Sequence, residues 1–175
     1  MKRKPIIGVI GSHEDEWEQY AVPLGTYIAK NNYHLLTGAG GGVMTAVAKA
    51  FTAVLEKNSM CIGLYPVKDY NQKINHVDFP NPYIEIPIVT LLSERAQSDT
   101  VPESRNAVNI LSSDVIVALP GLHGTMNEVS LSLMAQKPMI LFGKVSDFQD
   151  FPEQAQCVET MDELEQFIQQ QLAQH

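Results

Sequence analysis

The sequence is short of charge, of cysteine and of long apolar runs, and each shortage argues against a class of protein. Only 18% of its 175 residues are charged and 45% are hydrophobic, which is typical of a globular domain and not of a disordered chain. No apolar run reaches the roughly 18 residues of a membrane-spanning helix, and the stretch after the basic residues 2–4 is too short for a signal-peptide core. We therefore expect a soluble, cytoplasmic protein that forms a single domain over residues 1–175 and has no membrane partner.

Basic residues are too few and too scattered for nucleic-acid binding. Lysine and arginine together number 12 against 20 acidic residues, for a net charge of −8, and the longest basic run is residues 2–4. A protein that follows a nucleic-acid backbone needs a stripe of such residues. A phosphate on a small molecule can still be held locally, because backbone N–H groups act over short distances. The composition argues against a nucleic-acid partner and leaves a phosphorylated small molecule open.

Cysteine and histidine give no sign of a disulfide framework or a metal site. Cys61 and Cys157 are each flanked by apolar residues, which favours two small buried thiols in a reducing compartment, with one disulfide as the alternative. His34, His76 and His175 stand alone, without the spacing of metal ligands. We expect neither a metal nor a cofactor.

Short apolar runs that end in glycine, serine or proline alternate with longer helix-period stretches. This alternation predicts an α/β protein with a mostly parallel sheet. The runs are almost continuously hydrophobic, which is typical of strands covered by helices on both faces. We therefore predict a three-layer, Rossmann-like fold. The expected strands are residues 5–10, 34–37, 60–66, 84–88, 115–119 and 139–142.

The helical stretches are less sharply bounded than the strands. A helical apolar pattern covers residues 17–28, although Pro23 should kink that helix or start a new one. Thr160 and Glu163 form a capping-box pattern that predicts a last helix ending near residue 172. The remaining expected helices are residues 43–57, 102–112 and 125–136.

The stretch 67–82 is polar, contains prolines and has no strong period. Loops of this length are uncommon in compact domains and are often functional. A lid over a ligand and a plain surface excursion are both compatible with this sequence.

Two glycine-rich segments, 37–44 and 120–128, each follow an expected strand and precede an expected helix. Ligands of open α/β sheets bind beyond the carboxyl ends of the strands, where both segments would lie. Glycine lets a phosphate approach the backbone, and a helix N-terminus offers unpaired N–H donors. Tight turns alone could also explain one such segment, but two favour a phosphate site. The candidate ligand-binding residues are Gly11, Ser12, Gly38, Gly40, Gly41, Gly42, Met44, Asn106, Pro120, Gly121, His123, Gly124 and Thr125.

Neither segment carries a standard nucleotide fingerprint. Counted from Gly38, the third glycine of G-x-G-x-x-G is replaced by Val43, and the third strand ends without the acidic residue that holds a ribose. No Lys-Ser or Lys-Thr pair closes either glycine run, so a Walker A loop is also absent. NAD and nucleoside triphosphates are poor candidates for the ligand.

The motifs resemble the LOG-like superfamily, often labelled "possible lysine decarboxylase", which includes cytokinin-activating phosphoribohydrolases and molybdenum cofactor carrier proteins. The resemblance rests on Gly-Gly-Gly-Val-Met at 40–44, on Ser104-Arg105-Asn106, and on residues 120–128, which match P-G-G-x-G-T-x-x-E except at Leu122. It covers roughly residues 6–142. It implies a Rossmann-like fold and a homodimer or homotetramer.

The phosphoribohydrolases of this superfamily hold a 5′-phosphate on the glycine-threonine loop and hydrolyse an N-glycosidic bond with an arginine and a glutamate. The resemblance assigns these catalytic roles to Arg105 and Glu128. A carboxylate can activate water and stabilise an oxocarbenium-like state, and an arginine can neutralise developing charge. The first hypothesis is a nucleoside 5′-monophosphate phosphoribohydrolase that releases a base and ribose 5-phosphate.

Departures from the pattern favour a second hypothesis. Asn106 stands where the cytokinin-type enzymes commonly have lysine, so the Arg-Asn pair is closer to the carrier branch. Leu122 would narrow or reshape the phosphate cradle, and His123 would either add a donor or point to solvent. The alternative function is a non-catalytic carrier or sensor of a phosphorylated ligand, such as molybdenum cofactor or a nucleotide.

Structural roles compete with each functional assignment. The dipole of a helix start stabilises a carboxylate such as Glu128 whatever its function. Arg105 could be an ordinary surface charge, and the acidic run 14–16 a helix start. His13, after the first strand, could line the same crevice or be a solvated loop residue. A lysine decarboxylase is not expected, because nothing suggests a Schiff-base site for pyridoxal phosphate. The lysines considered for that role are Lys30, Lys49, Lys137 and Lys144.

Overall fold

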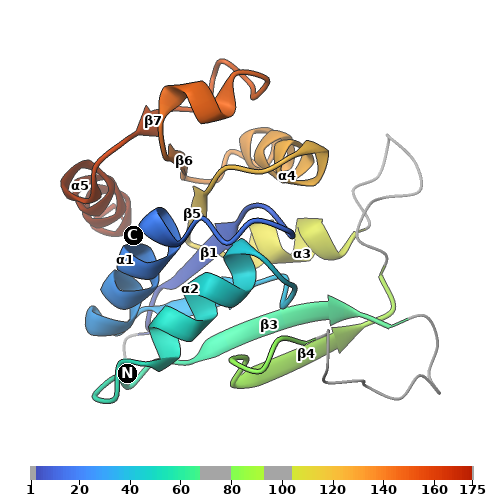
Figure 1. The fold of residues 1–175 in the computed structure, drawn as a ribbon, viewed down its shortest axis with the longest axis vertical. Helices are drawn as coiled ribbons and strands as arrows, with labels where there is room; N and C mark the ends of the chain where they lie inside the picture. The colour runs from blue at the N-terminus through green and yellow to red at the C-terminus, as the bar shows by residue number, and fades with distance from the viewer. Residues whose placement is uncertain (1–2, 68–79, 93–103, 175) are drawn as a thin grey trace.

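A computed structural model describes residues 3–67, 80–92 and 104–174 (Figure 1). Strands and helices alternate along the chain, as the sequence predicts. The elements are β1 (Ile6–Ile10), α1 (Glu18–Lys30), β2 (His34–Thr37), α2 (Val43–Thr52), β3 (Cys61–Pro66), β4 (Ile86–Thr90), α3 (Arg105–Ser112), β5 (Val115–Ala118), α4 (His123–Met134), β6 (Met139–Phe142), a 3-10 helix (Val145–Phe148), β7 (Cys157–Val158) and α5 (Met161–Leu172).

The strands form one seven-stranded sheet in the order β4-β3-β2-β1-β5-β6-β7, and every pairing is parallel. The chain runs outward from β1 to β4 and then returns to place β5 on the other side of β1. Ile7 is therefore paired with Leu35 on one side and with Val115 on the other. The predicted Rossmann-like α/β fold is confirmed, and its topological switch point lies at β1.

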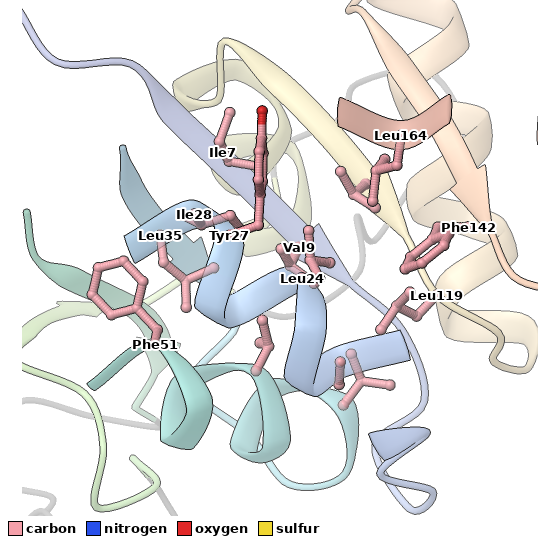
Figure 2. Close-up of a cluster of buried hydrophobic side chains, with 14 of the residues drawn as sticks. Ile7, Val9, Leu24, Tyr27, Ile28, Leu35, Phe51, Leu119, Phe142 and Leu164 are labelled. Carbon is pink, nitrogen blue, oxygen red and sulfur yellow. The ribbon is translucent and has the colours of Figure 1, made fainter. Parts of the chain in front are cut away.

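Helices cover both faces of the sheet. The cluster on one face joins alternate strand residues such as Ile7 and Val9 to α1, α2 and α5, and Figure 2 shows Leu24, Phe51 and Leu164 from these helices around it. The cluster on the other face joins the intervening residues, such as Ile10 and Ile116, to α3 and α4. Strands covered on both faces have to be hydrophobic at every position, which explains their continuous apolar runs.

Several element boundaries differ from the expectation. β4 lies at Ile86–Thr90 instead of 84–88, α2 ends at Thr52 instead of 57, and α4 starts at His123 instead of 125. Helix α1 runs unbroken through Pro23, because the carbonyl left without an N–H partner belongs to the exposed residue Gln19. Most of the stretch 67–82, considered as a lid or an excursion, lies outside the described residues, as does the expected helix start at 102–103.

Other expectations from composition can be compared with the structure directly. Cys61 is buried and Cys157 is half-buried, and both are free thiols, so the disulfide alternative is wrong. Within the part of the chain that the structure describes, no helix combines the length and the hydropathy needed to cross a membrane.

Candidate functional site

A cavity of about 240 Å³ lies at the carboxyl end of β1. β1 is the switch point of the sheet, with β2 on one side of it and β5 on the other. This is the place where open α/β sheets bind ligands. The loop after β1 contributes residues 11–14, and the first glycine segment contributes Gly38 and Met44. Helix α3 contributes Arg105 and Asn106, and the second glycine segment contributes Leu122, Gly124, Thr125 and Glu128.

The structure brings many of the predicted site residues together, from segments far apart in the sequence. Those that line the cavity are Gly11, Ser12, Gly38, Met44, Arg105, Asn106, Gly124, Thr125 and Glu128. Those that are not among its lining residues are Gly40, Gly41, Gly42, Pro120, Gly121 and His123. The cavity also has lining residues that were not predicted as site residues, namely Val9, Ile10, His13, Glu14 and Leu122.

The first glycine turn is filled by the protein itself. The carbonyl of Ser12 accepts a hydrogen bond from the N–H of Val43, at 2.9 Å, so the start of α2 is already engaged. A Cβ at Gly41 would lie 2.8 Å from the carbonyl oxygen of His13. Gly42 has φ 54° and ψ −129°, a conformation that side chains rarely adopt. The glycines at 40–42 thus make room for the loop after β1, and the N–H of Val43 at the start of α2 is occupied by the protein itself.

The second glycine turn presents a helix start without a side-chain cap. Helix α4 begins at His123, and its N-cap residue Leu122 makes no side-chain capping hydrogen bond. The first N–H groups of an α-helix have no partner within the helix, and they carry the positive end of its dipole. Gly124 and Thr125, from this first turn, line the cavity. Of the two glycine segments, the second therefore has the geometry of an anion site.

Arg105 is not the surface charge that one reading of the sequence allowed, since only 6% of it is exposed. Its Nη1 atom donates to the carbonyls of Gly38 at 2.7 Å and Leu64 at 3.3 Å, and its Nη2 atom donates to Oδ1 of Asn106 at 3.2 Å. The hydroxyl of Ser104 caps α3 by accepting from the N–H of Ala107, at 3.2 Å. The guanidinium therefore joins the residue after β2 and the interior of β3 to the start of α3.

Glu128 lies in the second turn of α4, not in its first, so the stabilisation expected at a helix start is weaker at this position. It is half-buried and lines the cavity on the side of α4. A carboxylate here accepts hydrogen bonds and can act as a general base.

The loop after β1 places one acidic side chain, Glu14, in the wall of the cavity. The hydroxyl of Ser12 accepts from the N–H groups of Glu14 and Asp15, at 3.2 and 2.9 Å, so the run 14–16 forms a turn before α1 instead of the expected helix start. His13 is exposed, yet it lines the cavity together with Glu14. The sequence signal for both was their position directly after the first strand.

The departure from the glycine motif, Leu122, lies in the wall of the cavity. Leu122 is 71% exposed and is part of the cavity wall, so it adds an apolar surface at the entrance. His123 is exposed and is not a lining residue, which agrees with the solvent-facing alternative. Among the residues that the structure describes, no group of three or more histidine, cysteine, aspartate or glutamate residues could hold a metal ion.

The sheet topology, with a cavity at its switch point, is that of a Rossmann-like α/β protein. The family model that its sequence matches places it in the LOG-like superfamily. The chain belongs to the SLOG cluster4 family, whose model matches residues 4–172.

Solved structures of two other proteins are similar to this chain over nearly its whole length. The molybdenum cofactor binding protein from Rippkaea orientalis is 29% identical with a TM-score of 0.75, and the similarity covers 98% of this chain and 99% of that one. The Moco carrier protein from Chlamydomonas reinhardtii is 30% identical with a TM-score of 0.74, covering 99% and 100% of the two chains. A curated relative from Archaeoglobus fulgidus, described as an uncharacterized protein, is 29% identical over 133 residues, which is 75% of each chain.

Proposed function

We propose that this protein binds and carries a phosphorylated pterin of the molybdenum cofactor type and leaves it chemically unchanged. The observation that carries the proposal is the similarity, over nearly the whole chain, to the molybdenum cofactor binding protein of Rippkaea orientalis and the Moco carrier protein of Chlamydomonas reinhardtii. A similarity of this extent includes all the segments that form the cavity.

The residues of the cavity suit the chemistry of such a ligand. The uncapped first turn of α4, with Gly124 and Thr125, would hold the phosphate. The carboxylate of Glu128 accepts hydrogen bonds, as the amino and ring N–H groups of a pterin require. Leu122 and Met44 offer apolar contacts for the ring system. The cavity volume of about 240 Å³ is below the ~300–1,000 Å³ of sites that enclose their ligand, so part of the pterin would stay accessible for transfer.

The proposal is tested by identifying what the protein retains and binds. The native protein and Glu128→Gln are purified. One sample of each is denatured, and the released small molecules are analysed by mass spectrometry. A second, folded sample of each is titrated with molybdopterin, and its thermal unfolding temperature is measured. We expect a retained or stabilising pterin with the native protein and a weaker effect with Glu128→Gln. Absence of both a retained pterin and a thermal shift with the native protein would overturn the proposal.

The second candidate function is the phosphoribohydrolase. The observation that favours it is that Arg105 and Glu128, the two residues implied as catalytic, line the same cavity. Native protein and Glu128→Gln are incubated with AMP, GMP, CMP, UMP and IMP, and free base is measured by chromatography. Release of a base by the native protein alone supports hydrolysis, with Glu128 in the chemistry. No release at high protein concentration excludes this function.

We also propose a homo-oligomer, dimer or tetramer, as the superfamily resemblance implies. Edge strand β4 supplies a surface for it, because Ile86, Ile88 and Val89 are 39, 45 and 46% exposed. This strand carries no charge, so contact there adds no local charge repulsion between two copies of a chain with net charge −8.

The backbone of β4 favours contact between the side chains of two copies over the addition of a strand of the second copy to the sheet. The carbonyl of Thr90 accepts from Val67 on the β3 side, and successive residues of a strand direct their backbone groups to opposite sides. Pro87 and Val89 therefore direct theirs outward, and Pro87 has no N–H to donate. An edge interrupted in this way resists strand addition but keeps its apolar side chains available.

A further inference from the structure

We propose that Asn106 donates the hydrogen bond that α3 makes to the ligand, and that Arg105 is a positioning residue that acts through Asn106. The inference rests on the proposed function, because it needs a ligand in this cavity. It reverses the simplest expectation from the resemblance, in which the arginine itself acts on the ligand.

The hydrogen bonds of Arg105 tie its guanidinium to the protein. Nη1 donates to two backbone carbonyls, that of Gly38 directly after β2 and that of Leu64 within β3. Nη2 donates to Oδ1 of Asn106 at 3.2 Å. A guanidinium that is bonded to two backbone carbonyls and only 6% exposed has a fixed position, and moving toward a ligand would cost it these bonds.

The orientation of the Asn106 amide follows from the chemistry of arginine. A guanidinium has only donors, so the amide must turn its oxygen toward Arg105. The Nδ2 group, with its two donor hydrogens, is then the part of the amide left for the cavity that Asn106 lines. Asn106 is 4% exposed, so it has little freedom to turn otherwise.

The arrangement also strengthens the donor. An amide oxygen that accepts from a cation is polarised, and the N–H groups of the same amide then donate more strongly. The group recognised is an acceptor oxygen, which the carbonyl of a pterin or purine and a phosphate oxygen both provide. A carboxylate at 106 would keep the bond to Arg105 and lose the donor.

Substitutions that change Asn106 and Arg105 one at a time test the inference. Asn106→Asp keeps an acceptor for Arg105 but turns an acceptor, instead of a donor, toward the ligand. Arg105→Lys removes the planar guanidinium that donates to three oxygens at once. Binding of molybdopterin and of the five nucleoside monophosphates is measured by calorimetry, and folding by thermal unfolding. We expect Asn106→Asp to unfold at or above the native temperature and to bind the best probe at least 100-fold more weakly.

A double-mutant cycle distinguishes positioning from direct contact. We expect Arg105→Lys to weaken binding 10-fold or more in the native background and less than 3-fold in Asn106→Ala. An equal loss in both backgrounds, or native-like binding by Asn106→Asp, would overturn the inference while the proposed function stands. If the native chain binds none of the probes, both proposals fail.

Discussion

Gly38 and Arg105 are fitted to each other at the base of the cavity. The carbonyl of Gly38 accepts from Nη1 of Arg105 at 2.7 Å, and a Cβ at residue 38 would lie 2.6 Å from the same nitrogen. Residue 38 therefore has to be a glycine to leave room for the guanidinium of Arg105. The motif suggests a different role, in which the missing side chain lets a phosphate approach the backbone.

Gly38→Ala is expected to displace the guanidinium and to lower the free energy of unfolding by about 1–3 kcal/mol, the usual cost of an overpacked site. The same substitution in an Arg105→Ala background should cost clearly less, because the atom that the new methyl group meets is gone. Urea unfolding of the four proteins measures both costs. Equal costs in the two backgrounds would contradict the fitted pair.

Protonation of His34 is expected to destabilise the protein in acid. Burial, followed by the charge of Lys4, lowers the pKa of His34 below its ordinary value of 6.5, and its Nδ1 atom accepts from the N–H of Met60 at 3.1 Å. As pH falls below 6.5 the unfolded chain takes up the proton first, so stability is present above this pH and is lost below it.

The His34 effect is measured by urea unfolding between pH 7.5 and 5. His34→Asn is the control, because its Oδ1 atom can replace Nδ1 as the acceptor and does not titrate. The variant should lose less stability than the native protein over this range. Identical pH profiles would show that other groups cause the acid sensitivity.

The thiol of Cys61 is expected to stay protonated and unreactive in the folded protein. Burial, with a smaller contribution from Glu85, raises its pKa from 9.0 to about 12. Since only the unfolded chain ionises readily, stability should be intact below pH 9 and fall above it, by about 1.4 kcal/mol per pH unit from this group.

Two measurements test Cys61. At pH 8 a thiol reagent should modify the half-buried Cys157 of the native protein well before Cys61, and denaturant should make both reactive. Urea unfolding between pH 8 and 10 should show a smaller loss for Cys61→Ala than for the native chain. Rapid modification of Cys61 under native conditions would contradict the burial.

Val89→Lys on β4 is expected to dissociate the proposed homo-oligomer. A lysine on each copy would bring like charges together at the apolar surface and add desolvation cost. Leu55→Lys is the matched control, because Leu55 is 93% exposed in the connection after α2. Sedimentation velocity should show a smaller particle for Val89→Lys only. An unchanged mass for both variants would place the contact elsewhere.

The sequence predicts the strands better than the helix ends, for physical reasons. A strand covered on both faces has a continuous apolar run, as at residues 139–142, whereas α2 continues its alanine-rich pattern into residues that are no longer helical. β7, Cys157–Val158, is only two residues long and leaves no pattern to detect. β4 begins two residues late because Glu85, at the expected strand, uses its carboxylate to accept from the N–H of Cys61.

The location of the cavity was predictable from the sequence, but the contacts of the nearby glycines were not. Strand-to-helix order places both glycine segments at one edge of the sheet, and Gly38 and Gly124 do line a common cavity. Whether a glycine admits a ligand or another part of the chain depends on what packs against it. At Gly42 the space is taken by the backbone of Ser12 and His13, which lie about 30 residues earlier in the sequence. The sequence around Gly42 alone cannot predict that contact.

The pairing of β1 with β5 has a consequence for how the protein is made. The loop after β1 is joined to the second glycine segment by the hydrogen bond from the N–H of Ser12 to the carbonyl of Pro120, across more than 100 residues. Such distant contacts form late in folding, because the intervening loop must first be closed. During synthesis the cavity therefore cannot form until α4 has left the ribosome. A ligand that contacts both segments would bind only the folded chain and would stabilise it.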